Sequence, residues 1–305
     1  MAAVPAAVLF LLMMPLPESP RWLVKVDRLE DARKNLERVR TGGDLDAELR
    51  EIQDLEEQER SSPTRGWSGL RKSWVRPALL VGCGIALFTQ LSGIEMIIYY
   101  TPTILTDVGF TEHKALLVSV ALAVTYLVMM LVGFGIIDRV GRRRLTLTMI
   151  PGAALALFVL GLVFVVGGDN ADTAWLLITC LVVFMFFNAG GLQLMGWLTG
   201  SEIYPLPVRG AGTAVQSAVL WGSNTVITLT LLTMIEAIGV GPSMWVYAAF
   251  NVLAWVFVLR RFPEMTGLSL EDIERSLRKG KFRPGEVEAS AETRAASGAA
   301  AAASA

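Results

Sequence analysis

Apolar residues gather in seven runs along the chain, and polar connections separate these runs. They cover residues 1–16, 77–101, 115–137, 145–167, 174–198, 211–236 and 243–261. Most of them approach the roughly 20 residues that an α-helix needs to cross a hydrocarbon core of about 30 Å. The pattern therefore predicts an all-α fold, a polytopic membrane helix bundle with about seven transmembrane helices.

The first run could also be read as a signal peptide. It lacks a basic region at its start, and Pro-Glu-Ser-Pro-Arg follows it where a cleavage site would have small residues. We interpret residues 1–16 as a transmembrane helix.

A long polar stretch separates this first run from the other six. Within residues 29–39 and 45–55, apolar side chains recur at helical spacing, which predicts short amphipathic helices. A solvated linker is an equal alternative for residues 41–63. Near residues 67–74, tryptophans share one face and basic residues another, which is typical of a helix in the headgroup region.

Basic residues predict the orientation in the membrane. Of the 27 lysines and arginines, 26 fall on alternate connections, and the other set of connections holds only Lys114. The basic set is cytoplasmic by the positive-inside rule. We therefore expect a multi-pass protein of the plasma membrane with a cytoplasmic C-terminus and with Met1 outside.

The predicted organisation has four parts. A first transmembrane helix at 1–16 precedes a cytoplasmic loop at 17–76 with short amphipathic helices. A six-helix transmembrane half follows at 77–262. The cytoplasmic tail at 263–305 is rich in alanine and serine toward its end, where we expect disorder.

Composition supports a membrane protein and offers little for an enzyme. The chain is 53% hydrophobic and 18% charged, and its mean hydropathy is +0.51. There is no Ser-His-Asp set, no metal-spaced His or Cys cluster and no glycine-rich phosphate loop. Both cysteines, Cys83 and Cys180, lie inside apolar runs. We expect no catalytic residue, no metal, no cofactor and no nucleic-acid partner.

Four short stretches combine prolines, glycines and charges in a fixed order. They are Pro17-Glu18-Ser19-Pro20-Arg21-Trp22-Leu23, Asp138-Arg139-Val140-Gly141-Arg142-Arg143-Arg144, Gly196-Trp197-Leu198-Thr199-Gly200-Ser201-Glu202-Ile203-Tyr204-Pro205 with Arg209-Gly210, and Pro263-Glu264-Met265-Thr266-Gly267. Together they resemble the signatures of the sugar porter family of the major facilitator superfamily, the last one in a degraded form.

The resemblance implies that the chain holds the family's helices six to twelve and lacks helices one to five. The family fold has two pseudo-symmetric six-helix halves, with substrate bound between them at mid-membrane. The N-terminal half would then supply part of the binding site, in cis or in trans.

The resemblance also implies a substrate-binding set. Residues 88–100 look like the family's seventh helix, in which Gln90, Tyr99 and Tyr100 match while Thr89 and Glu95 replace amides. The set is Thr89, Gln90, Glu95, Tyr99, Tyr100, Tyr126, Trp197 and Asn224. Tyr126 and Leu220 stand where the family has amides, and these departures weaken the case for a hexose. Interfacial anchoring is an alternative for Trp197.

Glu95 is the most informative single residue. A carboxylate at mid-membrane depth costs about 2.5–3.5 kcal/mol or more unless it faces water or a partner. We hypothesise that Glu95 binds substrate hydroxyls or carries a coupling proton; a hydrogen-bonded structural role is the alternative.

Charges at the expected cytoplasmic helix ends form a second predicted set. It comprises Glu18, Arg21, Asp138, Arg139, Arg142, Arg143, Glu202, Arg209 and Glu264. In the family, such charges close the cytoplasmic side of the outward-facing state, and ion pairs made in one conformation alone can bias a two-state equilibrium. Simple positive-inside anchoring is the alternative.

The function that follows is transport of a small polar solute, a sugar or polyol, by alternating access. Proton symport stays open, because the family's usual coupling acid lies on its first helix. A truncated relic without transport, or a membrane sensor or scaffold on the same fold, is the alternative.

Overall fold

The computed structural model describes residues 3–39, 45–61, 66–107, 109–166 and 174–287. All regular elements in these ranges are helical, so the predicted fold class is confirmed. The chain divides into two compact units, an N-terminal unit within Met1–Arg65 and a helix bundle within Gly66–Ala305.

The N-terminal unit holds four helices, α1 (Ala3–Met13), α2 (Pro20–Lys25), α3 (Leu29–Val39) and α4 (Leu45–Ser61). Leu23, Val24 and Ala32 form its small core, against which Leu49 and Ile52 pack. Helices α3 and α4 bury their apolar stripes there, as helical spacing of apolar residues requires. Part of the stretch in which a linker was the alternative is thus helical; residues 41–44 and 62–63 lie outside the described residues.

Helix α1 is shorter than the span expected over residues 1–16. Its 11 residues are about 16 Å long at 1.5 Å per residue, roughly half a hydrocarbon core. Pro15 and Pro17 follow closely, and proline disfavours continuation of a helix. The side chains of Leu9 and Phe10 are 62% and 67% exposed. Among the described residues, six stretches are long and apolar enough to cross a membrane, and α1 is not one of them. The transmembrane helix expected over residues 1–16 stays a prediction.

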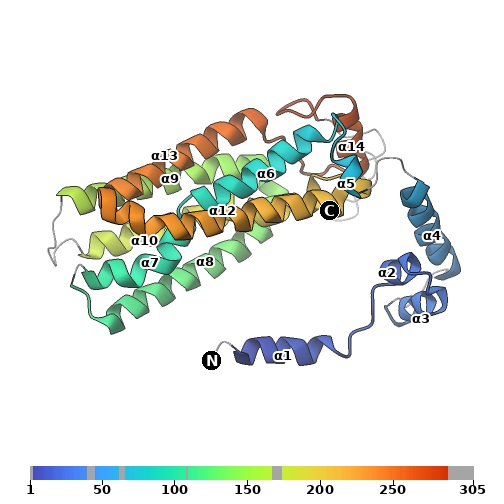
Figure 1. The fold of residues 1–305 in the computed structure, drawn as a ribbon, viewed down its shortest axis with the longest axis horizontal. Helices are drawn as coiled ribbons and strands as arrows, with labels where there is room; N and C mark the ends of the chain where they lie inside the picture. Colours follow the sequence, from blue (N-terminus) through green and yellow to red (C-terminus); the bar gives the residue numbers. More distant parts are fainter. Residues whose placement is uncertain (1–2, 40–44, 62–65, 108, 167–173, 288–305) are drawn as a thin grey trace, which may run out of the picture. The chain divides into compact units, whose positions relative to one another are not determined.

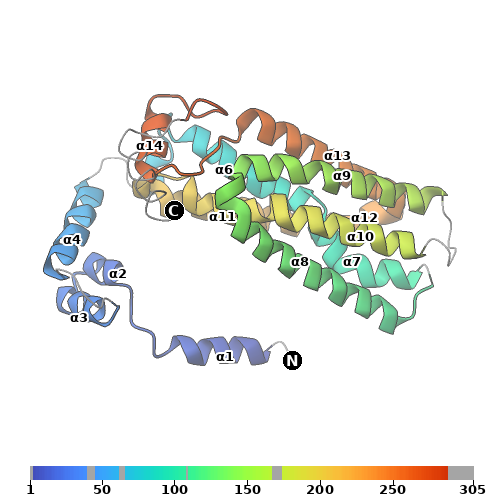
Figure 2. The ribbon, with the colours of Figure 1, turned by 180° about the vertical axis from the view of Figure 1, so that it is seen from behind.

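The helix bundle contains the six stretches that are long and apolar enough to cross a membrane. They run roughly along one direction, as the views from the front and from behind show (Figures 1 and 2). Its elements are α5 (Gly66–Gly69), α6 (Arg76–Leu91), α7 (Ile94–Asp107), α8 (Glu112–Val140), α9 (Arg142–Val166), α10 (Ala174–Asn188), η2 (Ala189–Gln193), α11 (Leu194–Glu202), η3 (Leu206–Val208), α12 (Arg209–Ile238), α13 (Val240–Arg261) and α14 (Leu270–Arg278).

Two of the six stretches are interrupted. Helices α6 and α7 form one stretch that breaks at Ser92 and Gly93. A π-helical turn, η2, separates α10 from α11. Interruptions of this kind leave backbone groups that other side chains must satisfy inside a bilayer.

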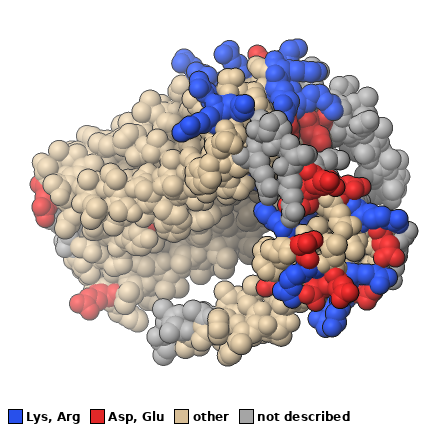
Figure 3. Space-filling model, turned by 45° about the vertical axis from the view of Figure 1, so that its right-hand side comes forward, with Lys and Arg blue, Asp and Glu red and all other residues tan. Residues whose placement is uncertain are grey.

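The flank of the bundle is apolar, whereas its described lysines and arginines, apart from Lys114 at the start of α8, gather at one end. Exposed large hydrophobic side chains line α8 and α12, including Leu131, which is 62% exposed, and Leu229, which is 74% exposed. Figure 3 shows the uncharged flank and the charged end. Monomeric soluble proteins rarely expose apolar patches of this extent. We call the end where α8 and α13 finish and α9 begins the basic end.

Gly93 offers a test of the break between α6 and α7. Its φ is +91°, and a Cβ atom there would meet the side chain of Tyr247 at 3.1 Å. We expect Gly93→Ala to lower the free energy of unfolding of the detergent-purified protein by about 1–3 kcal/mol, because the left-handed conformation is strained for alanine. Its melting temperature should fall accordingly. Gly135→Ala is the matched control, since nothing lies within 4 Å of its Cβ position. Equal melting temperatures for both variants would contradict the prediction.

Candidate functional site

An amide pair joins α6 to α12 inside the bundle. Asn224 Nδ2 donates a hydrogen bond to Gln90 Oε1 over 3.1 Å. Gln90 is 1% exposed, so its amide is buried inside the bundle. Polar side chains that bond across membrane helices fix the helices' relative register.

Glu95 lies beside this pair, in the first turn of α7. Its carboxylate interacts with the Tyr99 hydroxyl one turn later and with the amide of Asn224. The N-terminal turn of a helix favours a carboxylate, because the free backbone N–H groups there carry partial positive charge. Gln90, Glu95, Tyr99 and Asn224 therefore form one group, which we call the polar cluster.

Two tryptophans stand close to the polar cluster along α12. Trp197 of α11 and Trp221 of α12 meet edge to face, with ring centroids 6.2 Å apart and planes at 67°. They are 50% and 56% exposed. Trp221 is three residues before Asn224, so the two side chains share one face of α12. An exposed aromatic pair thus lies one helical turn from the polar cluster.

Three predicted substrate residues have different surroundings. Thr89 is fully buried, and its hydroxyl donates to the carbonyl oxygens of Ile85 over 2.7 Å and Leu192 over 3.2 Å. Tyr100 and Tyr126 are half-buried and pack against the hydrophobic core. Among the described contacts, no hydrogen bond joins these three side chains to the polar cluster.

Asn251 is a residue that the sequence reading did not single out. It is fully buried on α13, and its Nδ2 donates to the backbone carbonyls of Ser92 and Tyr247, each over 2.8 Å. Asn251 therefore satisfies a backbone group that the break between α6 and α7 leaves free. The signal available in the sequence was a lone asparagine inside the apolar run 243–261.

An ion-pair network lies at the basic end, centred on Arg142. Its guanidinium pairs with the carboxylate of Asp138 over 2.6 Å and makes a two-pronged contact with Glu202, over 2.9 and 3.2 Å. The Arg142 side chain is only 12% exposed and that of Glu202 23%. Two parallel bonds between a guanidinium and a carboxylate are among the stronger hydrogen-bonded contacts in proteins. The network links the end of α8 and the start of α9 to the end of α11.

Glu264 extends the network through backbone contacts. Its carboxylate accepts hydrogen bonds from the backbone N–H groups of Arg142, Arg143 and Arg144, over 2.8, 3.1 and 3.4 Å. Thr266 adds its hydroxyl over 2.7 Å. Glu264 thus caps the N-terminus of α9 from the segment after α13, where a negative charge is favoured.

The remaining predicted charges have separate environments. Arg143 Nη2 donates to the carbonyl of Leu259 over 3.0 Å, and Arg209 Nε donates to that of Tyr204 over 3.3 Å. Arg139 is exposed and, among the described residues, has no ion pair. Glu18 and Arg21 are exposed in the N-terminal unit. Burial raises the pKa of the Tyr204 phenol, because it disfavours the charged phenolate.

Residues 1–277 match the family described as "Sugar (and other) transporter". The putative metabolite transport protein YwtG of Bacillus subtilis (strain 168) is 36% identical over 278 residues, which cover 91% of this chain and 60% of that protein. The major myo-inositol transporter IolT of the same organism is 34% identical, over 91% and 59%. The D-xylose transporter of Levilactobacillus brevis is 33% identical, over 91% and 60%. The chain thus spans about 60% of the length of these relatives.

Solved structures show the same fold. The proton:xylose symporter XylE bound to 6-bromo-6-deoxy-D-glucose aligns with a TM-score of 0.71 at 25% identity, over 89% of this chain and 57% of that chain. The partially occluded, inward-open conformation of the xylose transporter XylE from E. coli aligns with a TM-score of 0.70, over 87% and 54%.

Proposed function

Because the chain belongs to the sugar (and other) transporter family, we propose that it forms part of a transporter for a sugar or polyol. The solute would cross the bilayer by alternating access between two halves of a major facilitator fold. The bundle described above is one of these halves. A second half, in cis or in trans, would complete the binding site.

The observation that carries this proposal is the polar cluster beside two exposed tryptophans. The side chains of Gln90, Asn224, Tyr99 and Glu95 combine donors and acceptors, as a polyhydroxylated ligand requires. Trp197 offers a flat apolar face to the C–H side of a sugar ring and one N–H donor. These groups interrupt spans that are otherwise apolar, which is the usual sign of a solute pathway.

The charge network has a proposed role in gating. Arg142, Glu202, Asp138 and Glu264 join four segments at the basic end: the ends of α8 and α11, the start of α9 and the segment after α13. We place this end on the cytoplasmic side of the plasma membrane. Arg139, Arg143, Arg209, Glu18 and Arg21 would support the same closure. Bonds made when the cytoplasmic side is closed, and lost when it opens, would bias alternating access.

Uptake of a panel of labelled sugars, polyols and small organic acids into vesicles tests the proposal. It is measured with the chain alone and with the N-terminal half of a sugar porter relative restored. We expect Asn224→Leu to lower uptake of the preferred solute at least about tenfold, since it removes the amide between Gln90 and Glu95.

The matched control is Thr225→Val, next to Asn224. Among the described residues, the Thr225 hydroxyl bonds to the carbonyl of Trp221 in its own helix and to no other group, so we expect near-normal uptake. Melting temperatures of both variants show whether each is folded. If the restored transporter takes up none of the sugars or polyols in the panel, the proposed function is contradicted.

A further inference from the structure

A separate pocket opens at the basic end, next to the start of α6. Its volume is about 300 Å³. Its lining comes from Ser73, Arg76, Pro77, Leu80, Val81, Arg261, Gly280, Phe282 and Arg283. None of these residues belongs to the polar cluster or to the network around Arg142.

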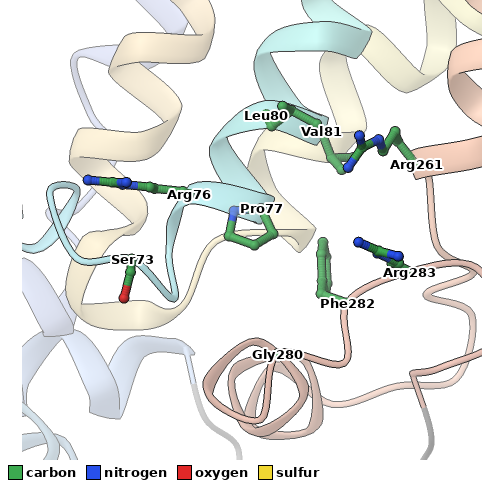
Figure 4. Close-up of a pocket in the computed structure, with 9 residues that line it drawn as sticks. All are labelled: Ser73, Arg76, Pro77, Leu80, Val81, Arg261, Gly280, Phe282 and Arg283. Atoms are coloured by element: carbon green, nitrogen blue, oxygen red, sulfur yellow. The ribbon is translucent and has the colours of Figure 1, made fainter.

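Two arginines give the pocket its charge. Arg261 is the last residue of α13, and Arg283 lies in the segment after α14. Figure 4 shows both side chains extending in the same direction, toward the space beside Pro77 and Phe282, whereas Arg76 points the other way. No described residue forms an ion pair with Arg261 or Arg283, in contrast to Arg142. Two guanidinium groups therefore face the pocket with no ion-pair partner in the part of the chain that the structure describes.

The walls of the pocket are apolar. Val81 and Phe282 are 2% and 4% exposed and form its floor, while Leu80 is 48% exposed on the flank of the bundle. Pro77 stands in the first turn of α6, a helix of 16 residues whose N-terminal end also favours an anion. The pocket thus offers positive charge beside an apolar wall that continues onto the lipid-facing flank.

We propose that this pocket binds the phosphate group of an anionic phosphate ester. Guanidinium groups suit phosphate, because each can donate two parallel hydrogen bonds to its oxygens. The ester's organic part would lie against Leu80 and Pro77. An anionic phospholipid and a soluble phosphate ester share this chemistry. The pocket lies where membrane helices begin and end, at the expected level of the headgroups.

The test measures melting temperature of the full chain in maltoside detergent during titration with phosphatidylglycerol, because a ligand that binds the folded state raises this temperature. We expect the half-saturating concentration to rise at least about tenfold in the double variant Arg261→Gln, Arg283→Gln, since charge-assisted hydrogen bonds are lost. Arg283 lies after α14, so its replacement should leave the helices intact. If the double variant does not fold, Arg283→Gln alone should still raise the half-saturating concentration.

The matched control is Arg260→Gln with Lys281→Gln. Both residues are exposed neighbours of the pocket arginines, neither lines the pocket, and the net charge changes equally. If anionic lipid were attracted only by diffuse positive charge, the half-saturating concentration would rise equally in both double variants. That result would overturn the proposal. A wild type whose melting temperature rises neither with phosphatidylglycerol nor with sn-glycerol 3-phosphate would also overturn it.

A second titration identifies the source of the phosphate. It uses sn-glycerol 3-phosphate in detergent that contains phosphatidylcholine. Stabilisation by phosphatidylglycerol alone, lost in the pocket variant, assigns the site to membrane lipid. Stabilisation by sn-glycerol 3-phosphate that the pocket variant also loses assigns it to a soluble ester. Both results support a phosphate pocket.

Discussion

Replacing Arg142 by glutamine is expected to lower the free energy of unfolding of the bundle by about 3 kcal/mol, the range seen when one partner of a buried ion pair is removed. Arg142 is 12% exposed and contacts Asp138 and Glu202 at once, from the first residue of α9. Its loss leaves the carboxylate of Glu202, 23% exposed, without the guanidinium that compensates its desolvation. The larger part of the cost arises from this orphaned charge.

Denaturant or thermal unfolding in detergent measures this effect, with Arg139→Gln as the control. Arg139 is an exposed neighbour without an ion pair among the described residues, so its replacement should change stability by less than about 0.5 kcal/mol. Glu202→Gln completes a double-mutant cycle, in which we expect a coupling of about 1–3 kcal/mol. A coupling near zero would show that Arg142 and Glu202 do not stabilise each other.

Replacing Glu95 by glutamine is expected to lower uptake of the preferred solute about tenfold or more in the restored transporter. A carboxylate accepts hydrogen bonds with both oxygens and does so more strongly than an amide, which must turn one donor toward the solute. Glu95 also contacts Tyr99 and Asn224, and glutamine has nearly the same size. The variant should therefore keep the helix packing and lose the charge.

Uptake of each variant is measured against external pH, with Glu112→Gln as the control. Glu112 is exposed in the first turn of α8, so its replacement should leave uptake unchanged. Loss of the pH dependence in Glu95→Gln would assign a coupling proton to Glu95. A retained pH dependence with reduced uptake would assign hydroxyl binding alone. Unchanged uptake with an unchanged pH profile would refute both roles.

The sequence by itself determined the class of fold and the family. A long run of apolar residues indicates a segment that lies in hydrocarbon. Its backbone groups must then form their hydrogen bonds within the segment, which a helix does. Within the described residues, helical segments accordingly occupy each of the six runs between residues 77 and 261. The four motifs, which identified the family, were visible because they lie in contiguous stretches.

Only the tertiary structure decided which residues meet. Glu264 caps α9 from more than 100 residues away, and Asn224 reaches Gln90 across 134 positions. The sequence placed Arg142 and Glu202 in one set of nine charged residues, and the structure shows that these two side chains meet. Thr89 belongs to the predicted substrate set, and only the structure shows that its hydroxyl bonds to backbone carbonyls of Ile85 and Leu192.

The physical reason is the range of each interaction. Helix formation and membrane insertion depend on the residues within one span, so hydrophobic patterning predicts them. Hydrogen-bond and ion-pair partners depend on how α6, α7 and α12 pack and on where each helix ends, which no local pattern encodes. The chain's polar residues were therefore identifiable as candidates from the sequence, and their grouping into one polar cluster and one network came from packing.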